Sequence, residues 1–79
     1  MKLNIKLYGT LSRSFDNYDH LSGLEVILPD GTSIHDLLVH LNLLPVRIGM
    51  VLMNGKPAQK DTRLENQAQI KFFQPIAGG

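Results

Sequence analysis

Residues 24–38, Leu-Glu-Val-Ile-Leu-Pro-Asp-Gly-Thr-Ser-Ile-His-Asp-Leu-Leu, decide the fold of this 79-residue chain. The apolar run 24–28 is typical of a strand, and Pro29-Asp30-Gly31 predicts the turn that ends it. Thr32 or Ser33 can then cap a helix. The apolar residues that follow recur at i, i+3, i+4 and i+7, namely Ile34, Leu37, Leu38 and Leu41. This stripe predicts one amphipathic helix that ends before Pro45.

Three further strands are predicted around this strand and helix. Residues 2–8 alternate between polar and apolar side chains, as a half-buried strand requires. Residues 49–53 form a short apolar run before Asn54-Gly55, which predicts a tight turn. A last strand places residues 70 and 72 on one face and residues 71 and 73 on the other, and Pro75 ends it. Residues 10–23 are expected to form a loop held down by a helical turn through its large apolar residues, Leu11, Phe15, Tyr18 and Leu21.

The order strand, strand, helix, strand, loop, strand favours an α+β fold in which one mixed sheet carries the main helix on one face. Among such folds the β-grasp (ubiquitin-like) arrangement fits best. A ferredoxin-like alternative needs a second full helix between residues 55 and 68, where the apolar periodicity is weak. We therefore predict a β-grasp domain over residues 1–74, followed by a flexible C-terminal arm over residues 75–79.

Composition excludes several classes of function. The net charge is +1 and the basic residues are scattered, so nucleic acid is not an expected partner. The chain has no cysteine, so it can hold neither a disulfide nor an iron–sulfur cluster. His20, His35 and His40 are not spaced as metal ligands, and Lys56 and Lys60 lack the glycine-rich loop of a phosphate site. The chain shows neither a leader pattern nor an apolar stretch long enough to cross a bilayer, which predicts a cytoplasmic protein without membrane contact.

The segment from Pro75 to Gly79 is the candidate functional part. Proline cannot continue a strand ladder, and Gly78 and Gly79 have no side chains, so a partner's pocket can close around the backbone. Five extended residues reach about 16 Å. Tyr8 and Phe73 fall on the outward face of their strands and predict an aromatic docking patch at the root of the arm. The alternative is that the 10–23 loop covers both rings.

Five segments of the chain resemble the ubiquitin-like sulfur carriers. The likeness is strongest to the small subunit of molybdopterin synthase and weaker to the thiamine-pathway sulfur carrier. The segments are Lys6-Leu7-Tyr8-Gly9-Thr10-Leu11, Leu28-Pro29-Asp30-Gly31-Thr32, Val51-Leu52-Met53-Asn54-Gly55-Lys56, Asp61-Thr62-Arg63-Leu64 and Ile70-Lys71-Phe72-Phe73-Gln74-Pro75-Ile76-Ala77-Gly78-Gly79. Only the last is specific, since the others are typical of β-grasp domains in general.

The resemblance implies that a ubiquitin-activating-type adenylyltransferase uses ATP to adenylate the Gly79 carboxylate, which then becomes a sulfur-donating thiocarboxylate. The chain would be neither an enzyme nor the holder of a bound cofactor. It would dock through Tyr8 and Phe73 and insert Pro75, Ile76 and Ala77 into the large subunit of molybdopterin synthase or another sulfur acceptor. A thiamine-pathway carrier and a ubiquitin-like protein modifier are the alternatives.

Two departures from the family pattern bear on the choice of pathway. Glu65-Asn66-Gln67 stands where Asp-Gly-Asp is frequent, and Gln74 stands where molybdopterin-synthase subunits often have a second proline. The ending Phe-Gln before Ile-Ala-Gly-Gly also resembles the thiamine carriers. The long 10–23 segment favours the molybdopterin side.

Overall fold

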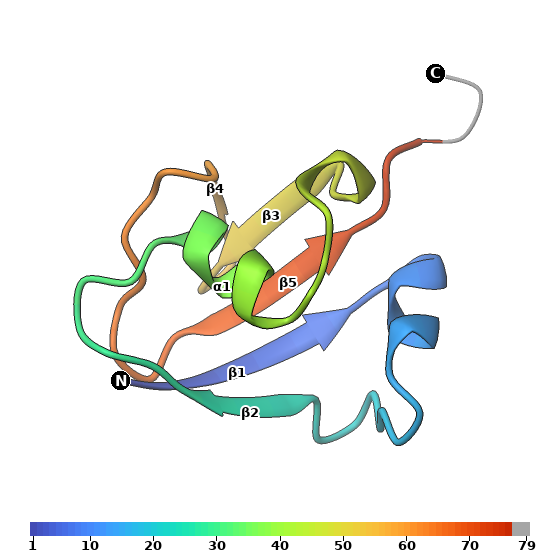
Figure 1. Ribbon diagram of the computed structural model, residues 1–79, viewed down its shortest axis with the longest axis horizontal. Helices are drawn as coiled ribbons and strands as arrows, with labels where there is room; N and C mark the ends of the chain where they lie inside the picture. Colours follow the sequence, from blue (N-terminus) through green and yellow to red (C-terminus); the bar gives the residue numbers. More distant parts are fainter. Residues whose placement is uncertain (77–79) are drawn as a thin grey trace.

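Residues 1–76 are described by the structure, a computed structural model, and residues 77–79 lie outside the described part of the chain. Five strands form one mixed sheet, and their bounds are β1 Lys2–Leu7, β2 Leu24–Ile27, β3 Met50–Met53, β4 Lys56–Ala58 and β5 Gln69–Phe73. The strand order is β2-β1-β5-β3-β4 (Figure 1). The neighbouring strands β1 and β5 run parallel, and every other pair is antiparallel. The predicted α+β, β-grasp architecture is confirmed.

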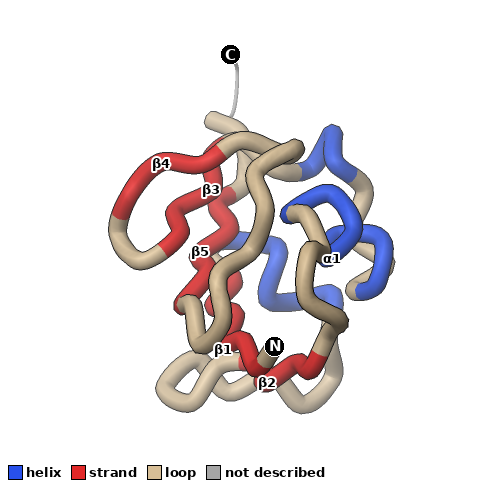
Figure 2. The backbone as a smooth tube through the Cα atoms, turned by 90° about the vertical axis from the view of Figure 1, so that its left-hand side faces the viewer, coloured by secondary structure: helices blue, strands red, loops and turns tan. Residues whose placement is uncertain are grey.

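The main helix, α1 (Ile34–His40), covers one face of this sheet (Figure 2). Ser33 is its N-cap and forms a capping box with Asp36: the Ser33 hydroxyl accepts from the Asp36 N–H at 3.1 Å, and the Asp36 carboxylate accepts from the Ser33 N–H at 3.3 Å. Such a cap stabilises a helix by about 1 kcal/mol. Of the two candidate caps, the structure uses Ser33, so the helix begins at Ile34. It ends well before Pro45, as the apolar stripe predicts.

The core lies between α1 and the sheet. The alternation read from the sequence is confirmed, because Leu3, Ile5 and Leu7 of β1 and Ile70 and Phe72 of β5 are almost completely buried. Leu11, from the 3-10 helix η1 (Gly9–Ser14), is also buried. Phe15 and Tyr18 pack against the core, so the 10–23 segment is held down as expected, although Leu21 is exposed.

One strand of the sheet, β4, is not predicted by the sequence. Residues 54–58 turn at Asn54-Gly55, where both residues have positive φ (53° and 82°), and return as β4 along β3. The turn was predicted, whereas β4 was not, because Lys-Pro-Ala carries no strand pattern. Pro57 is tolerated because β4 lies at the edge of the sheet.

Gln67 adopts a left-handed backbone, with φ 62°, in the turn before β5. A side chain in this region costs about 1 kcal/mol, which glycine avoids at some cost in chain entropy. We expect Gln67→Gly to raise the free energy of unfolding by about 0.5 kcal/mol, measured as the urea midpoint. Gln67→Ala is the matched control and should not raise it, since alanine keeps the Cβ that causes the strain; equal gains from both variants would contradict this explanation.

Candidate functional site

The candidate site lies where β5 ends and the chain leaves the sheet. Tyr8 follows β1 and Phe73 ends β5, and the two strands are neighbours with Leu7 paired to Phe72. The Tyr8 and Phe73 rings are stacked, with centroids 4.5 Å apart and planes 17° from parallel. On the other side of Phe73, Met50 of β3 is its partner in register and is 47% exposed. Tyr8, Phe73 and Met50 thus form a row across the neighbouring ends of β1, β5 and β3, on the sheet face opposite α1, which we call the exit row.

The exit row is partly exposed and partly covered by the 10–23 segment. Tyr8 and Phe73 are both half-buried. His20 places its ring edge-on to Tyr8, with centroids 4.8 Å apart, so the 10–23 segment covers one edge of the row. The sequence left two alternatives, an exposed aromatic patch or rings covered by the 10–23 loop, and the structure lies between them. The rings lie on the outward face, and the loop covers part of Tyr8. Phe73 and Met50 line a groove that continues along Pro75 and Ile76.

Tyr18 holds the covering segment in place. Its hydroxyl accepts from the Leu7 N–H at 2.8 Å and lies 3.0 Å from His20 Nδ1. The pairing of β1 with β2 extends only to Ile5, so the Leu7 N–H has no carbonyl acceptor on β2. The Tyr18 hydroxyl takes the place of that acceptor. His20 therefore reaches Tyr8 because Tyr18 is tied to β1.

Tyr18→Phe is expected to lower the free energy of unfolding by about 1 kcal/mol, because the part-buried Leu7 N–H loses its acceptor. Urea denaturation measures the loss. Tyr8→Phe is the matched control: the Tyr8 hydroxyl makes no hydrogen bond within residues 1–76, so its removal should change stability by less than about 0.5 kcal/mol. A similar loss from both variants would show that the Leu7 bond is not the cause.

The described part of the arm starts in close contact with the body. Gln74, Pro75 and Ile76 are exposed, and Ile76 reaches 89% exposure. Gly49 N–H donates to the Phe73 carbonyl at 2.7 Å, and a Cβ on Gly49 would lie 2.6 Å from Pro75 Cα. The predicted partner-binding residues Tyr8, Phe73, Pro75 and Ile76 therefore meet at one end of the sheet. The other predicted site residues, Ala77, Gly78 and Gly79, lie outside the described residues.

Sequence reasoning missed Met50, His20 and Gly49. Met50 and Gly49 belong to the site because β3 pairs antiparallel with β5, a register that no local pattern carries. Within residues 1–76 no group of three or more His, Asp or Glu side chains is placed to hold a metal ion. In the same residues every helix is too short or too polar to cross a bilayer.

Comparison with known proteins places the chain in a family. The sheet order and the single main helix packed on one face define a ubiquitin-like β-grasp protein. The model of the ThiS family matches residues 10–79. The chain belongs to the ThiS family.

Solved structures share the fold at low sequence identity. SAMP1 from Haloferax volcanii, a small archaeal modifier protein, superposes with a TM-score of 0.72 at 18% identity, covering 100% of both chains. A putative molybdopterin converting factor subunit 1 from Pyrococcus furiosus gives 0.69 at 16% identity, covering 95% of this chain and 98% of that one. A second H. volcanii protein, solved in solution, gives 0.75 at 18% identity, covering 100% of this chain and 87% of that one. No curated protein matches the chain by sequence.

Proposed function

We propose that this chain is a sulfur carrier in molybdopterin synthesis, with the α-carboxylate of Gly79 as the reacting group. A ubiquitin-activating-type adenylyltransferase supplies the catalytic groups and uses ATP as its co-substrate. A carboxylate oxygen attacks the α-phosphate, pyrophosphate leaves, and an acyl-adenylate forms. A hydrosulfide equivalent from a partner then displaces AMP, and the resulting thiocarboxylate is a polarisable nucleophile at neutral pH.

The position of β5 carries this proposal. β5 is the central strand, fixed on both sides by β1 and β3, and it ends at Phe73 beside the open part of the exit row. The chain then passes through exposed Gln74, Pro75 and Ile76 (Figure 1). A firmly held strand followed at once by an exposed segment is suited to presenting the residues that follow to another protein's active site.

The exit row is the proposed docking surface for these partners. Tyr8, Phe73 and Met50 offer an aromatic and apolar row, and aromatic side chains at the centre of an interface contribute most to affinity. A partner that docks on the row lies directly over the groove beside Pro75 and Ile76. In this proposal Pro75, Ile76 and Ala77 enter the large subunit of molybdopterin synthase or another sulfur-accepting enzyme. The chain itself performs no catalysis.

The connection between β1 and β2 supports the molybdopterin assignment over the thiamine pathway. It contains η1 and a loop anchored by Phe15 and Tyr18, whereas thiamine carriers usually make a tight hairpin there. The P. furiosus protein of similar fold is named as a putative molybdopterin converting factor subunit, and SAMP1 from H. volcanii is named as a modifier protein. Sulfur carriage and protein modification share the activation step and differ in the acceptor.

Mass spectrometry of the chain purified from its native host tests the proposal. A sulfur carrier is expected to show a fraction of molecules in which one oxygen of Gly79 is replaced by sulfur. Isopeptide-linked adducts on lysines of other proteins would instead support the modifier function. A mass that places further residues after Gly79 in the mature protein would overturn both.

A further inference from the structure

Gln74, the residue that departs from the family pattern, has its side chain fixed by Thr10. The Gln74 Oε1 atom accepts from the Thr10 N–H at 2.6 Å and from the Thr10 hydroxyl at 2.6 Å. A carboxamide oxygen has two lone pairs, and both are used here. Because a backbone N–H can only donate, the atom that faces Thr10 has to be the oxygen of Gln74.

Two glycines make room for the root of the arm on opposite sides. Gly9 has φ +66°, and a Cβ there would lie 2.5 Å from Gln74 Oε1. Gly49 lies on the other side, where a Cβ would meet Pro75 Cα at 2.6 Å. A side chain at Gly9 would displace the Gln74 side chain from Thr10, and a side chain at Gly49 would require the backbone of Gln74 and Pro75 to move. The chain therefore leaves the body between two backbone segments, 9–10 and 49.

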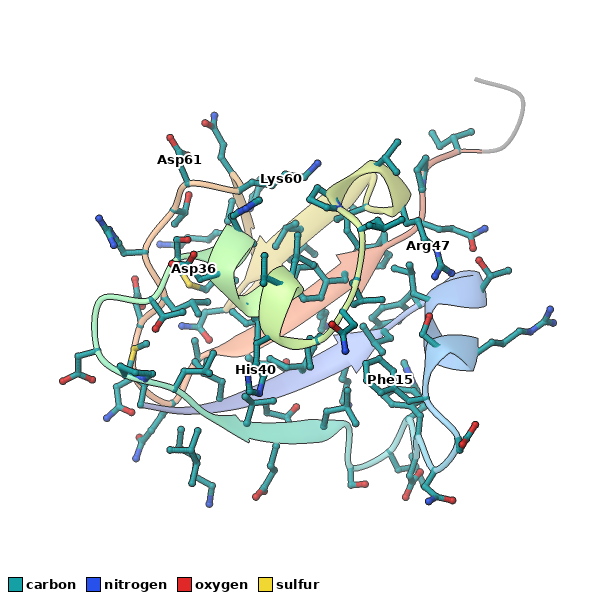
Figure 3. All side chains as sticks on the ribbon, in the orientation of Figure 1. Phe15, Asp36, His40, Arg47, Lys60 and Asp61 are labelled. Carbon is teal, nitrogen blue, oxygen red and sulfur yellow. The ribbon has the colours of Figure 1, made fainter. Side chains whose placement is uncertain are left out.

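Residues that follow the first segment and precede the second are joined by a hydrogen bond. Arg47, in the 3-10 helix η2 (Pro45–Arg47), donates from Nη1 to the Ser14 hydroxyl at 3.2 Å. Arg47 lies beside η1 in Figure 3. Thr10 and Ser14 thus contact Gln74 and η2 respectively, and Gly49 closes the ring by donating to the Phe73 carbonyl. We call this ring, formed by Thr10, Ser14, Arg47, Gly49 and Gln74, the collar.

We propose that Gln74 is a positioning residue which, through the collar, fixes where the arm begins and the direction in which it leaves the sheet. With Gln74 bound to Thr10, the last residue held by a side-chain contact is Gln74, and five residues in an extended conformation span at most about 16 Å. Release of Gln74 adds one residue, about 3 Å, and removes the fixed direction. The use of this direction by a partner rests on the proposed function, whereas the tie itself does not.

Amide measurements on the free chain test the tie. Gln74→Met keeps the length of the side chain and removes its acceptor. We expect the Thr10 amide to exchange with solvent about tenfold faster in this variant. The amide order parameters of Gln74 and Ile76 should fall towards the value of about 0.6 or less that marks flexible backbone.

Gln74→Glu retains an acceptor oxygen at the same place. In this variant the Thr10 exchange rate and the amide order parameters should equal those of the original chain. Gln69→Met, on the same strand, is the matched control, because the Gln69 side chain makes no hydrogen bond within residues 1–76. It should leave the Thr10 amide unchanged. Exchange rates and order parameters in Gln74→Met equal to those of the original chain would overturn the proposal.

Adenylation kinetics test whether a partner uses the fixed exit. With the cognate activating enzyme, Gln74→Met should raise the KM for the carrier about tenfold and leave kcat within twofold, and Gln74→Glu should restore KM. An unchanged KM in Gln74→Met would show that the partner does not read the exit direction. If the original chain is not adenylated at all, the proposed function fails, and the amide data still decide whether Gln74 fixes the arm.

Discussion

Removal of Gly79 should reduce adenylation by the activating enzyme by more than about 100-fold. One residue fewer withdraws the carboxylate by about 3 Å, and a misplacement of about 1 Å at a reacting centre already costs about 100-fold. The measurement is ATP–pyrophosphate exchange with the purified enzyme, followed by sulfur transfer in a reconstituted assay. Addition of one alanine after Gly79 should have an effect of similar size, because it moves the carboxylate in the opposite direction.

The fold of both variants should be unchanged. Gly79 lies beyond β5 and the collar, so the urea midpoint and the amide fingerprint of residues 1–76 are the controls. Unaltered adenylation of the shortened chain would reject Gly79 as the reacting residue. A shifted urea midpoint would show instead that the variant acts through stability.

Phe73→Ala and Tyr8→Ala should each weaken binding of the large synthase subunit or the activating enzyme by about 2 kcal/mol, roughly 30-fold. Each removes one ring of the stacked pair in the exit row and opens a gap in the proposed interface. Isothermal titration calorimetry measures the affinity. Stacked rings also contribute about 1 kcal/mol to folding, so the urea midpoint of each variant has to be measured alongside.

Ile27→Ala is the matched control for the exit row. Ile27 is 78% exposed and pairs with Lys2 of β1, so it lies on the same face of the sheet at the opposite end from Tyr8. Its loss should change the affinity less than twofold. Equal losses from Ile27→Ala and Phe73→Ala would indicate that the whole face, and not the exit row, contacts the partner.

Local patterns were sufficient for most of the fold. The buried residues of β1 and β5, the Ser33 cap and the Asn54-Gly55 turn each follow from spacing or turn chemistry within a few residues. β4 was missed because its pairing depends on β3 and leaves no mark on its own three residues. Patterns within ten residues thus predict elements, and they do not predict which edge residues will pair.

The candidate site was only partly predictable for a similar reason. Outward parity placed Tyr8 and Phe73 on the sheet face where the structure has them, since alternation is a local property. Gln74 was interpreted from sequence only as a departure from a family pattern, and its contact with Thr10 joins residues 64 positions apart. The tie exists because parallel pairing places the ends of β1 and β5 side by side, which requires the three-dimensional arrangement.

The parallel pairing of β1 with β5 also affects how the protein is made. Asn4 pairs with Gln69 and Leu7 pairs with Phe72. The first strand to be synthesised therefore pairs with the last one, and the middle of the sheet can form only after β5 has been made. Contacts between such distant residues slow folding. A nascent chain on the ribosome therefore lacks the central strand, with its buried Phe72, until β5 emerges, and prematurely terminated chains that lack β5 will not reach the native state. Translation thereby limits the folded pool to molecules whose synthesis has passed β5.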